Sequence, residues 1–515
     1  MRAILTILTC CLITAGPVFA GTSPFQPKMG DPIDGLTPTE LQRFIDGKAA
    51  FTRVFTAADG LGPIFNKESC ANCHNNPVGG AGSQTVTRFG IPDQKGGPFN
   101  PLTELGGSLL QQQAISPSCQ ETVPDLPGIF TTFRATPSAL GFGLIEAIAD
   151  ADIEAGELAP PPGISGRVHW VSAVEDPPGS PLPAGRFGWK SQVATMMTFS
   201  AGASKNEVGI TNPLNMQDND PNGINPPALA DCDSVADPEV GMTFIQQLTD
   251  FQRFLAPPPQ TPQSGMTGEA VFSTIGCTDC HIPAFTTPDD PALEGALRNR
   301  VLKPYSDFLL HDMGLLFDGI PQGGAQAGEI RTLPLWGIRI HDPMLHDASV
   351  SGSSFATRVS QAIADHGQIG SEAKPAVDQF FALSQADRDA VIAFLDSLGR
   401  REFDHDGDND VDANDQAQFI ACYSGAVPAY TPDDACSISD VDQNGTVDCA
   451  DWQVFEAAFL ADNGVLPILG MTDFVNVLVG TDLTAAHICI ADMNKDGTPD
   501  GGDIGDYITA VLAGS

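Results

Sequence analysis

Apolar side chains recur at helical spacing in one segment near the middle of the chain. From Met242 onwards they lie three or four positions apart, at Phe244, Ile245, Leu248, Phe251 and Leu255. This spacing predicts an amphipathic helix over Met242 to Leu255, because residues three and four apart share one helix face. Three prolines at 257–259 follow. Consecutive prolines end a helix and stiffen the chain beyond it.

Two further helical patterns occur between residues 263 and 401. A short one covers Gly268 to Ile275. A longer one has an apolar stripe made by Val391, Ile392, Phe394, Leu395 and Leu398. Ser384 and Asp387 have the spacing of a capping-box pair at its start, and Gly399 stands where helices commonly end. Elsewhere glycine and proline dominate, as at residues 79–82 and 160–163, which predicts loops.

The N-terminal residues have the pattern of a secretory signal. Arg2 supplies a positive charge, an apolar run extends from Ile4 to Ile13, and Val18, Phe19 and Ala20 resemble a cleavage site. The apolar run is too short to span a bilayer. We therefore expect an exported protein, located in the periplasm, at the cell surface or outside the cell.

Composition divides the chain into blocks. We predict a signal peptide at 1–20, a first domain at 21–262, a second domain at 263–401, and a small acidic module at 402–515. The formal net charge is −39, from 64 acidic and 25 basic side chains. This balance excludes nucleic acid as a partner, because phosphate binding needs clustered cations.

The sequence Cys-x-x-Cys-His occurs twice, at Cys70, Cys73 and His74, and at Cys277, Cys280 and His281. In this motif both thiols bond covalently to a haem and the histidine binds its iron. A zinc or redox site is the alternative for one copy. Two copies, each with a helix closing its block as in cytochrome c, predict two covalent c-type haems.

The sixth ligand of each iron decides between catalysis and electron transfer, because an open position binds peroxide or oxygen. Candidates for the second haem are His311, Met313, His341, Met344, His346 and His366. The first haem has fewer candidates, because His169 is the single histidine between His74 and His281. We therefore expect the first iron to be open and reactive.

Further short motifs extend from Gly62 to Leu398. They are GPIFN at 62–66, CHNNP at 73–77, RATP at 134–137, GLIEAI at 143–148, GRFGWK at 185–190, NEVGIT at 206–211, YSD at 305–307, HDMG at 311–314, RTLPLWG at 331–337 and LHD at 345–347. In these motifs the chain resembles the bacterial diheme oxidoreductases. That group is similar to diheme cytochrome c peroxidases and MauG-like enzymes.

The resemblance implies roles for individual residues. Trp189 matches a tryptophan between the two haems and is implied to relay electrons. Glu207 matches an acid in the peroxide pocket, where it would move a proton between the peroxide oxygens. His366 falls where the peroxidases place the methionine ligand of the electron-transfer haem, and Met313 is the second candidate. The distal histidine that the peroxidases carry after the first motif is missing, which favours an open first haem as in MauG-like enzymes.

The acidic module contains three similar segments whose oxygen ligands have the spacing of a calcium loop. The first has Asp404, Asp406, Asp408, Asp412 and Asp415, with the Asp410 carbonyl at position seven; the second has Asp440, Asp442, Asn444, Asp448 and Asp451; the third has Asp492, Asn494, Asp496, Asp500 and Asp503. Asn409, Gly445 and Gly497 occupy the turn at position six. We expect Val411 and Val447 to pair two loops in a short strand.

Because they have aspartate at position twelve, these loops resemble those of dockerin modules rather than those of full EF-hands. This resemblance implies bound calcium and a partner at the cell surface. The six cysteines outside the haem motifs allow several disulfide pairings. We favour Cys422 with Cys436, Cys449 with Cys489, and Cys119 with Cys232.

The sequence thus predicts a mainly α protein with two cytochrome c-like domains and a small helical calcium module. Its expected activity is reduction of hydrogen peroxide or a similar small oxidant, with electrons from a donor protein of unknown identity. Two alternatives remain, an electron-transfer cytochrome with both irons six-coordinate and a surface scaffold in which the acidic module is primary.

Overall fold

The structure is a computed structural model that describes residues 24–92, 99–224, 232–424 and 429–514. The predicted signal peptide at 1–20 lies outside these residues. Within the described chain, no helix is both long enough and apolar enough to span a membrane.

All three predicted helices are present, close to the predicted bounds. The first is α5, Met242–Phe254, with Leu255 as its extended C-cap. The second is α6, Thr267–Thr274. The third is α9, Gln385–Ser397, whose N-cap Ser384 accepts a hydrogen bond from the Asp387 N–H. Gly399 follows that helix with φ +125°, where glycine has little steric penalty.

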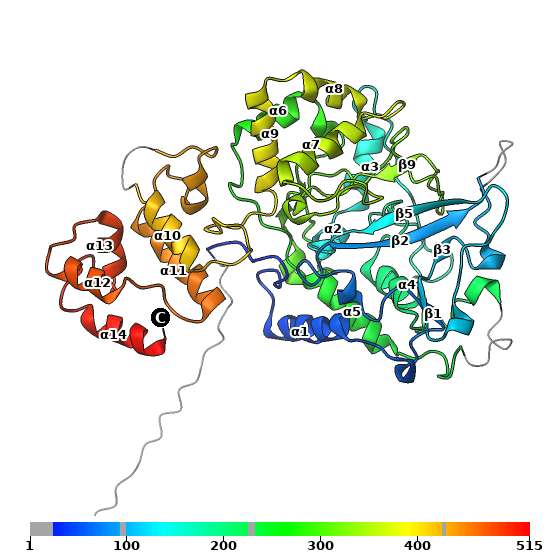
Figure 1. Ribbon diagram of the computed structural model, residues 1–515, viewed down its shortest axis with the longest axis horizontal. Helices are drawn as coiled ribbons and strands as arrows, with labels where there is room; N and C mark the ends of the chain where they lie inside the picture. Colours follow the sequence, from blue (N-terminus) through cyan, green and yellow to red (C-terminus); the bar gives the residue numbers. More distant parts are fainter. Residues whose placement is uncertain (1–23, 93–98, 225–231, 425–428, 515) are drawn as a thin grey trace, which may run out of the picture.

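The first part of the chain combines helices with a small antiparallel sheet. Its helices are α1 (Pro38–Thr52), α2 (Phe142–Glu146), α3 (Asp150–Leu158), α4 (Met196–Val208) and α5. Its strands are β1 (Ile64–Phe65), β2 (Gly82–Gly90), β3 (Leu109–Leu110), β4 (Gln113–Ala114) and β5 (Phe130–Thr136). The sheet order is β3-β2-β5, and α1 and α5 lie together below it in Figure 1.

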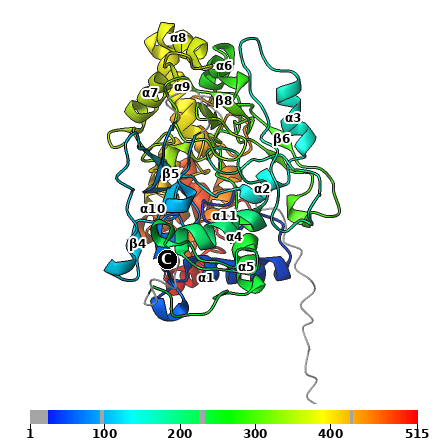
Figure 2. The ribbon, with the colours of Figure 1, turned by 90° about the vertical axis from the view of Figure 1, so that its right-hand side faces the viewer.

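The second part combines four helices with two short β-ribbons and long loops. Its helices are α6, α7 (Phe355–His366), α8 (Lys374–Ala382) and α9. Its strands form two short ribbons, β6 (Phe285–Thr286) with β7 (Val301–Leu302), and β8 (Leu310–Asp312) with β9 (Glu329–Arg331). The turned view places the same four helices together at the top (Figure 2).

The strand β2 lies in a region that the glycine content predicted as loop. It pairs antiparallel with β5 from Gly82 to Gly90, and Phe89 is fully buried. The structure is rich in helices, as the mainly α prediction expected, and this sheet corrects the prediction of loop in this region. The apolar residues Val86 and Phe89 are separated by two polar residues, so the sequence has no period-two alternation that would reveal this strand.

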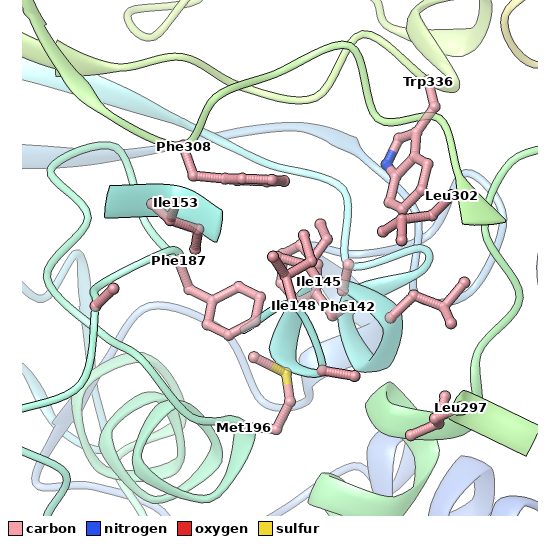
Figure 3. Close-up of a cluster of buried hydrophobic side chains, with 14 of the residues drawn as sticks. Phe142, Ile145, Ile148, Ile153, Phe187, Met196, Leu297, Leu302, Phe308 and Trp336 are labelled. Carbon is pink, nitrogen blue, oxygen red and sulfur yellow. The ribbon is translucent and has the colours of Figure 1, made fainter. Parts of the chain in front are cut away.

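One hydrophobic cluster crosses the predicted boundary at residue 262. Phe142, Phe187 and Met196 come from the first part, while Phe308 and Trp336 come from the second (Figure 3). Burial of such large side chains strongly favours the folded state. The two halves that carry the Cys-x-x-Cys-His motifs therefore share one core.

The C-terminal module is a separate group of helices beside the rest of the protein (Figure 1). It contains α10 (Ala413–Cys422), α11 (Cys449–Asn463), α12 (Met471–Leu478), α13 (Ala485–Ala491) and α14 (Ile504–Ala513). Its own core includes Phe403, Phe419, Phe455 and Trp452. Residues near the chain start hold it in place, because Gln26 bonds both oxygens of Glu402 and Met29 exchanges two bonds with Asn409.

Candidate haem sites

The two Cys-x-x-Cys-His motifs fold into the same tight turn. Cys70–Asn72 and Cys277–Asp279 are single 3-10 turns. In each, the histidine N–H donates to the carbonyl of the first cysteine at 3.0 Å. The turn brings both thiols and the imidazole together over one surface, as covalent haem attachment requires.

Both motif histidines are oriented by a backbone carbonyl. The Nδ1 atom of His74 lies 3.2 Å from the Gly80 oxygen, and Nδ1 of His281 lies 2.8 Å from the Tyr305 oxygen. A carbonyl only accepts, so Nδ1 carries the proton and Nε2 keeps its lone pair for a metal. Burial lowers the pKa of both imidazoles to about 4, which keeps them neutral.

The cysteines divide as the motifs predict. Cys70, Cys73, Cys277 and Cys280 form no disulfide. The other six described cysteines pair as Cys119–Cys232, Cys422–Cys436 and Cys449–Cys489, which are the favoured pairings.

The second motif opens onto a cavity of about 370 Å³. Cys277, Cys280 and His281 line one side, and α7, α8 and α9 contribute apolar side chains such as Val359, Phe380 and Leu395. An apolar cavity beside two free thiols and an oriented imidazole fits a covalently attached haem.

Two histidines can be removed from the candidate iron ligands, because both of their ring nitrogens are already bonded. His311 bonds Asp307 at 2.8 Å and Glu372 at 3.1 Å. Although burial opposes it, hydrogen bonds with Asp307, Cys280 and Glu372 raise the pKa of His311 to about 12. His169 bonds the Lys190 oxygen through Nδ1 and accepts the Gly324 N–H at Nε2.

His366, the first candidate for the second iron, lines the cavity at the end of α7. Its Nδ1 lies 2.6 Å from the Ala362 carbonyl, so Nε2 is free to face a ligand. His341 also lines the cavity, and its Nε2 is buried without a partner. Met313, the second candidate from the sequence, lines the same cavity, as do Met344 and His346.

Glu207 lies beside the first motif, near the end of α4. Its side chain is half-buried, and desolvation raises its pKa while the hydrogen bond from Asn66 and the charge of Arg88 oppose the rise. The Asn66 Nδ2 donates to its Oε2 at 2.6 Å. The Glu207 carbonyl accepts the Asn66 and Lys67 N–H groups at 2.8 and 3.1 Å, which places this residue close to the haem-attachment turn at Cys70.

Trp189 is held between the two parts of the protein. Its Nε1 donates to the Ala135 oxygen at 2.8 Å, and the His346 ring packs edge-on against it at 6.1 Å. The Trp189 indole also lines the cavity beside the second motif.

The buried Asp318 carboxylate holds the residues next to both ends of the hydrogen bond between Trp189 and Ala135. Asp318 pairs with Lys190, the neighbour of Trp189, at 2.9 Å, and accepts the Arg134 Nε–H at 2.6 Å beside Ala135. Asp318 and Lys190 have no exposed surface. This arrangement restricts the indole, because moving it would separate buried charges.

The comparisons with known proteins agree with this site. A family model described as "Di-haem oxidoreductase, putative peroxidase" matches residues 128–398, which is more than half of the chain. The chain belongs to the di-haem oxidoreductase family. Membership implies c-type haem as the cofactor. No curated protein matches the chain.

Solved structures with similarity to this oxidoreductase share little of its sequence. One is a MauG-like protein associated with microbial copper homeostasis, with 14% identity, a TM-score of 0.34, and coverage of 72% of this chain and 94% of that one. Another is Kuenenia stuttgartiensis hydrazine synthase, with 13% identity, a TM-score of 0.30, and coverage of 77% and 99%. With TM-scores this low, the family assignment rests on the sequence match.

The three acidic loops of the oxidoreductase close in the same way. The acid at position twelve is buried in each, and it accepts two backbone N–H bonds from its own loop. Position six has positive φ in all three, at Asn409, Gly445 and Gly497, as predicted. In the first two loops, three carboxylates approach within 4.8 Å of one another, namely those of Asp404, Asp406 and Asp415, and of Asp440, Asp442 and Asp451.

The prediction that Val411 and Val447 pair in a short strand is wrong. The Val411 N–H donates to Asp462, and its carbonyl accepts from Asn463. Val447 instead bonds Ser424 through both its N–H and its carbonyl. Each loop is therefore closed by side chains of its neighbours rather than by the other loop.

Three residues of these sites were missed by sequence reasoning. Asp318 gave no signal, because a lone aspartate outside a motif does not reveal its partners. Arg331 belongs to the RTLPLWG motif at 331–337, from which no role was predicted for it. It is buried and lines the cavity beside the second motif. Arg88 on β2 lies close enough to Glu207 to lower the pKa of that carboxyl, but it was placed in a predicted loop.

Proposed function

We propose that this di-haem oxidoreductase reduces hydrogen peroxide or a similar small oxidant at the first haem, with electrons entering through the second. A c-type haem with an open iron position supplies peroxide binding and reduction. Cys70, Cys73 and His74 would hold the reactive haem. Cys277, Cys280 and His281 would hold the relay haem.

The observation that carries the proposal is the asymmetry between the two turns. A half-buried carboxyl, Glu207, lies beside the first turn, whereas the second faces a cavity lined by His366, His341 and Met313. His169, the one histidine between the motifs in sequence, has both ring nitrogens bonded elsewhere. Proton chemistry therefore belongs to the first site, and a filled sixth position belongs to the second.

Glu207 is the proton carrier in this proposal. Reduction of peroxide to two waters consumes two electrons and two protons, and the O–O bond breaks heterolytically when a proton moves from the inner to the outer oxygen. A carboxyl with a raised pKa holds and returns such a proton. Its bond to Asn66 fixes the carboxyl in one orientation.

Trp189 is the bridge in this proposal, and His366 is the favoured sixth ligand of the second iron, with Met313 as the second candidate. The Asp318 pairs keep the indole in one position, so that the electron path does not depend on a mobile side chain. The electron donor is a protein of unknown identity.

Spectroscopy of the ferric protein with and without peroxide tests the proposal. We expect a high-spin component from the first haem, which peroxide alters while a low-spin component remains. Glu207→Gln should slow the reaction with peroxide by about 10²–10⁴-fold, as loss of a general acid–base does. Glu68→Gln, an acid near the first turn that bonds Asn72, is the matched control. A spectrum without high-spin haem that peroxide leaves unchanged would identify an electron-transfer cytochrome instead.

We also propose that the C-terminal module binds calcium in its acidic loops and attaches the oxidoreductase to a partner at the cell surface. The clustered carboxylates of the first two loops support the calcium sites, because Ca²⁺ prefers several oxygen ligands. The signal pattern and three disulfides support location in the periplasm or at the cell surface.

A further inference from the structure

The Arg331 guanidinium is a buried cation without an anionic partner. The side chain is 3% exposed and lines the cavity of the second motif. Its Nη1 has no hydrogen-bond partner, and no ion pair to it occurs among the described residues. An unpaired buried charge is strongly unfavourable.

The nearby carboxylates do not compensate this charge. Asp307 is the acid whose charge reaches Arg331, and its Oδ2 is bonded to His311. Asp318 is shared between Arg134 and Lys190. Burial accordingly lowers the pKa of Arg331 to about 9. Among the described residues, no carboxylate therefore contacts the Arg331 guanidinium.

Arg331 is also tied to the backbone that carries Trp189. Its Nε donates to the Gly188 oxygen at 2.7 Å, and its backbone N–H donates to the Trp189 oxygen at 2.9 Å. The guanidinium is thus fixed on one side by the tryptophan segment, while Nη1 stays free for a ligand in the cavity.

We propose that Arg331 binds a propionate of the second haem and so couples that haem to the Trp189 segment. A carboxylate is the anion that a guanidinium matches best, and a haem brings two of them. This inference rests on haem attachment at Cys277 and Cys280. Arg331 acts as a positioning residue, and its charge favours the ferrous form of the second haem.

The reduction potential tests this role without relying on peroxide turnover. We expect Arg331→Gln to lower the midpoint potential of the second haem. The expected change in its reduction equilibrium constant is tenfold or more, which corresponds to about 59 mV or more for one electron. Arg331→Lys keeps the charge but loses the fork, so its potential should fall less. The potential of the first haem should change less than that of the second in both variants.

Arg167→Gln is the matched control, because Arg167 lies outside the cavity and is already paired with Glu329 of the same strand β9. It should leave both potentials unchanged. Resonance Raman spectra should show a shift of the propionate bending mode in Arg331→Lys, a variant expected to fold even if the glutamine variant does not.

Unchanged potentials and unchanged propionate modes in the Arg331 variants would overturn the inference and indicate that Nη1 binds water. The outcome is separate from the proposed function. A protein that ignores peroxide but loses potential on Arg331→Gln supports the haem contact and contradicts the peroxidase reaction.

Discussion

His366 is the residue whose role is most open to a direct test. It ends α7 with Nδ1 bonded to Ala362, which leaves Nε2 free. We expect His366→Ala to increase high-spin ferric haem in the absorption and electron paramagnetic resonance spectra, because the second iron loses its sixth ligand. Met313→Leu should leave both spectra unchanged. A spectral change in Met313→Leu or His341→Ala, with none in His366→Ala, would assign the ligand differently.

Glu121 provides a test of pH dependence at a single residue. It is 2% exposed, and burial raises its pKa from 4.5 to about 7, against bonds from the Gln111 and Asn222 N–H groups. The folded pKa exceeds the unfolded one, so its contribution to stability is complete below pH 4.5 and is lost as pH rises through 7. The loss is at most about 3 kcal/mol.

Glu121→Gln should remove this dependence. At pH 8.5 the melting temperature of the variant should equal or exceed that of the wild type. At pH 5 the variant should lose this advantage, because the wild-type carboxyl is then protonated in the folded protein. Glu104→Gln, at an exposed acid in the same region, is the control. Parallel curves for Glu121→Gln and wild type across this range would contradict the raised pKa.

The sequence located the residues with covalent or acid–base chemistry but not those that hold them. Both Cys-x-x-Cys-His turns could be found because attachment fixes the spacing of thiols and imidazole. Glu207 and Trp189 came from the family resemblance, and the structure places each near a motif site. Asp318 and Arg331 could not be assigned, because their roles depend on contacts with residues more than a hundred positions away.

At the scale of elements, the loop carrying Trp189 depends on one buried carboxylate. Asp318→Asn removes the charge that compensates both Arg134 and Lys190. Breaking such a buried network costs about 3–5 kcal/mol. We expect a lower melting temperature and slower electron transfer between the haems after reduction of the second. Asp289→Asn, at an exposed acid, should change neither. A stable Asp318→Asn variant with normal transfer would show that the indole is fixed by other contacts.

The acidic loops should differ in their affinity for calcium. Close carboxylate groups occur in the first two loops, whereas the described residues of the third form none. We therefore expect isothermal titration to show two tighter calcium sites. Asp451→Ala should remove one of them, and Asp503→Ala should leave both. Equal loss in the two variants, or no binding at all, would contradict this order.

Helices were easier to predict than strands in this chain. The stripes of α5 and α9 extend over more than three turns, so their bounds were accurate to a residue or two. The strand β2 has no period-two alternation of apolar residues, and it pairs with β5, which lies some forty residues further on. The pairing of Val411 with Val447 failed because Asp462, Asn463 and Ser424 satisfy those backbone groups.

For the whole molecule, the shared core and the docked module have different consequences. The core around Phe187 and Phe308 joins the two haem-binding halves, so the distance between the motif turns is set by packing (Figure 3). The C-terminal module has a core of its own and is held through fewer, more polar contacts. Separation of the module should therefore leave the haem-binding part folded.

Arg401 is the residue on which that docking most depends. It is 2% exposed, donates to the Gln26 oxygen at 3.2 Å, pairs with Asp462 at 2.5 Å, and lies over the Phe25 ring. Arg401→Ala leaves the buried Asp462 carboxylate with the Lys28 ammonium at 3.4 Å and the Val411 N–H. We expect the substitution to reduce the free energy of docking by about 2–4 kcal/mol. This is at the lower end for breaking a buried ion pair, because one cation remains beside Asp462.

Limited proteolysis should show the consequence. In Arg401→Ala the chain between α9 and α10 should be cut sooner than in wild type, releasing the acidic module, while the larger fragment keeps both haems and an unchanged absorption spectrum. Arg388→Gln, on the surface of α9 and without contact to the module, should be cut at the wild-type rate. If Arg401→Ala loses haem as fast as it loses the module, the two parts unfold together and the docking contacts belong to one cooperative unit.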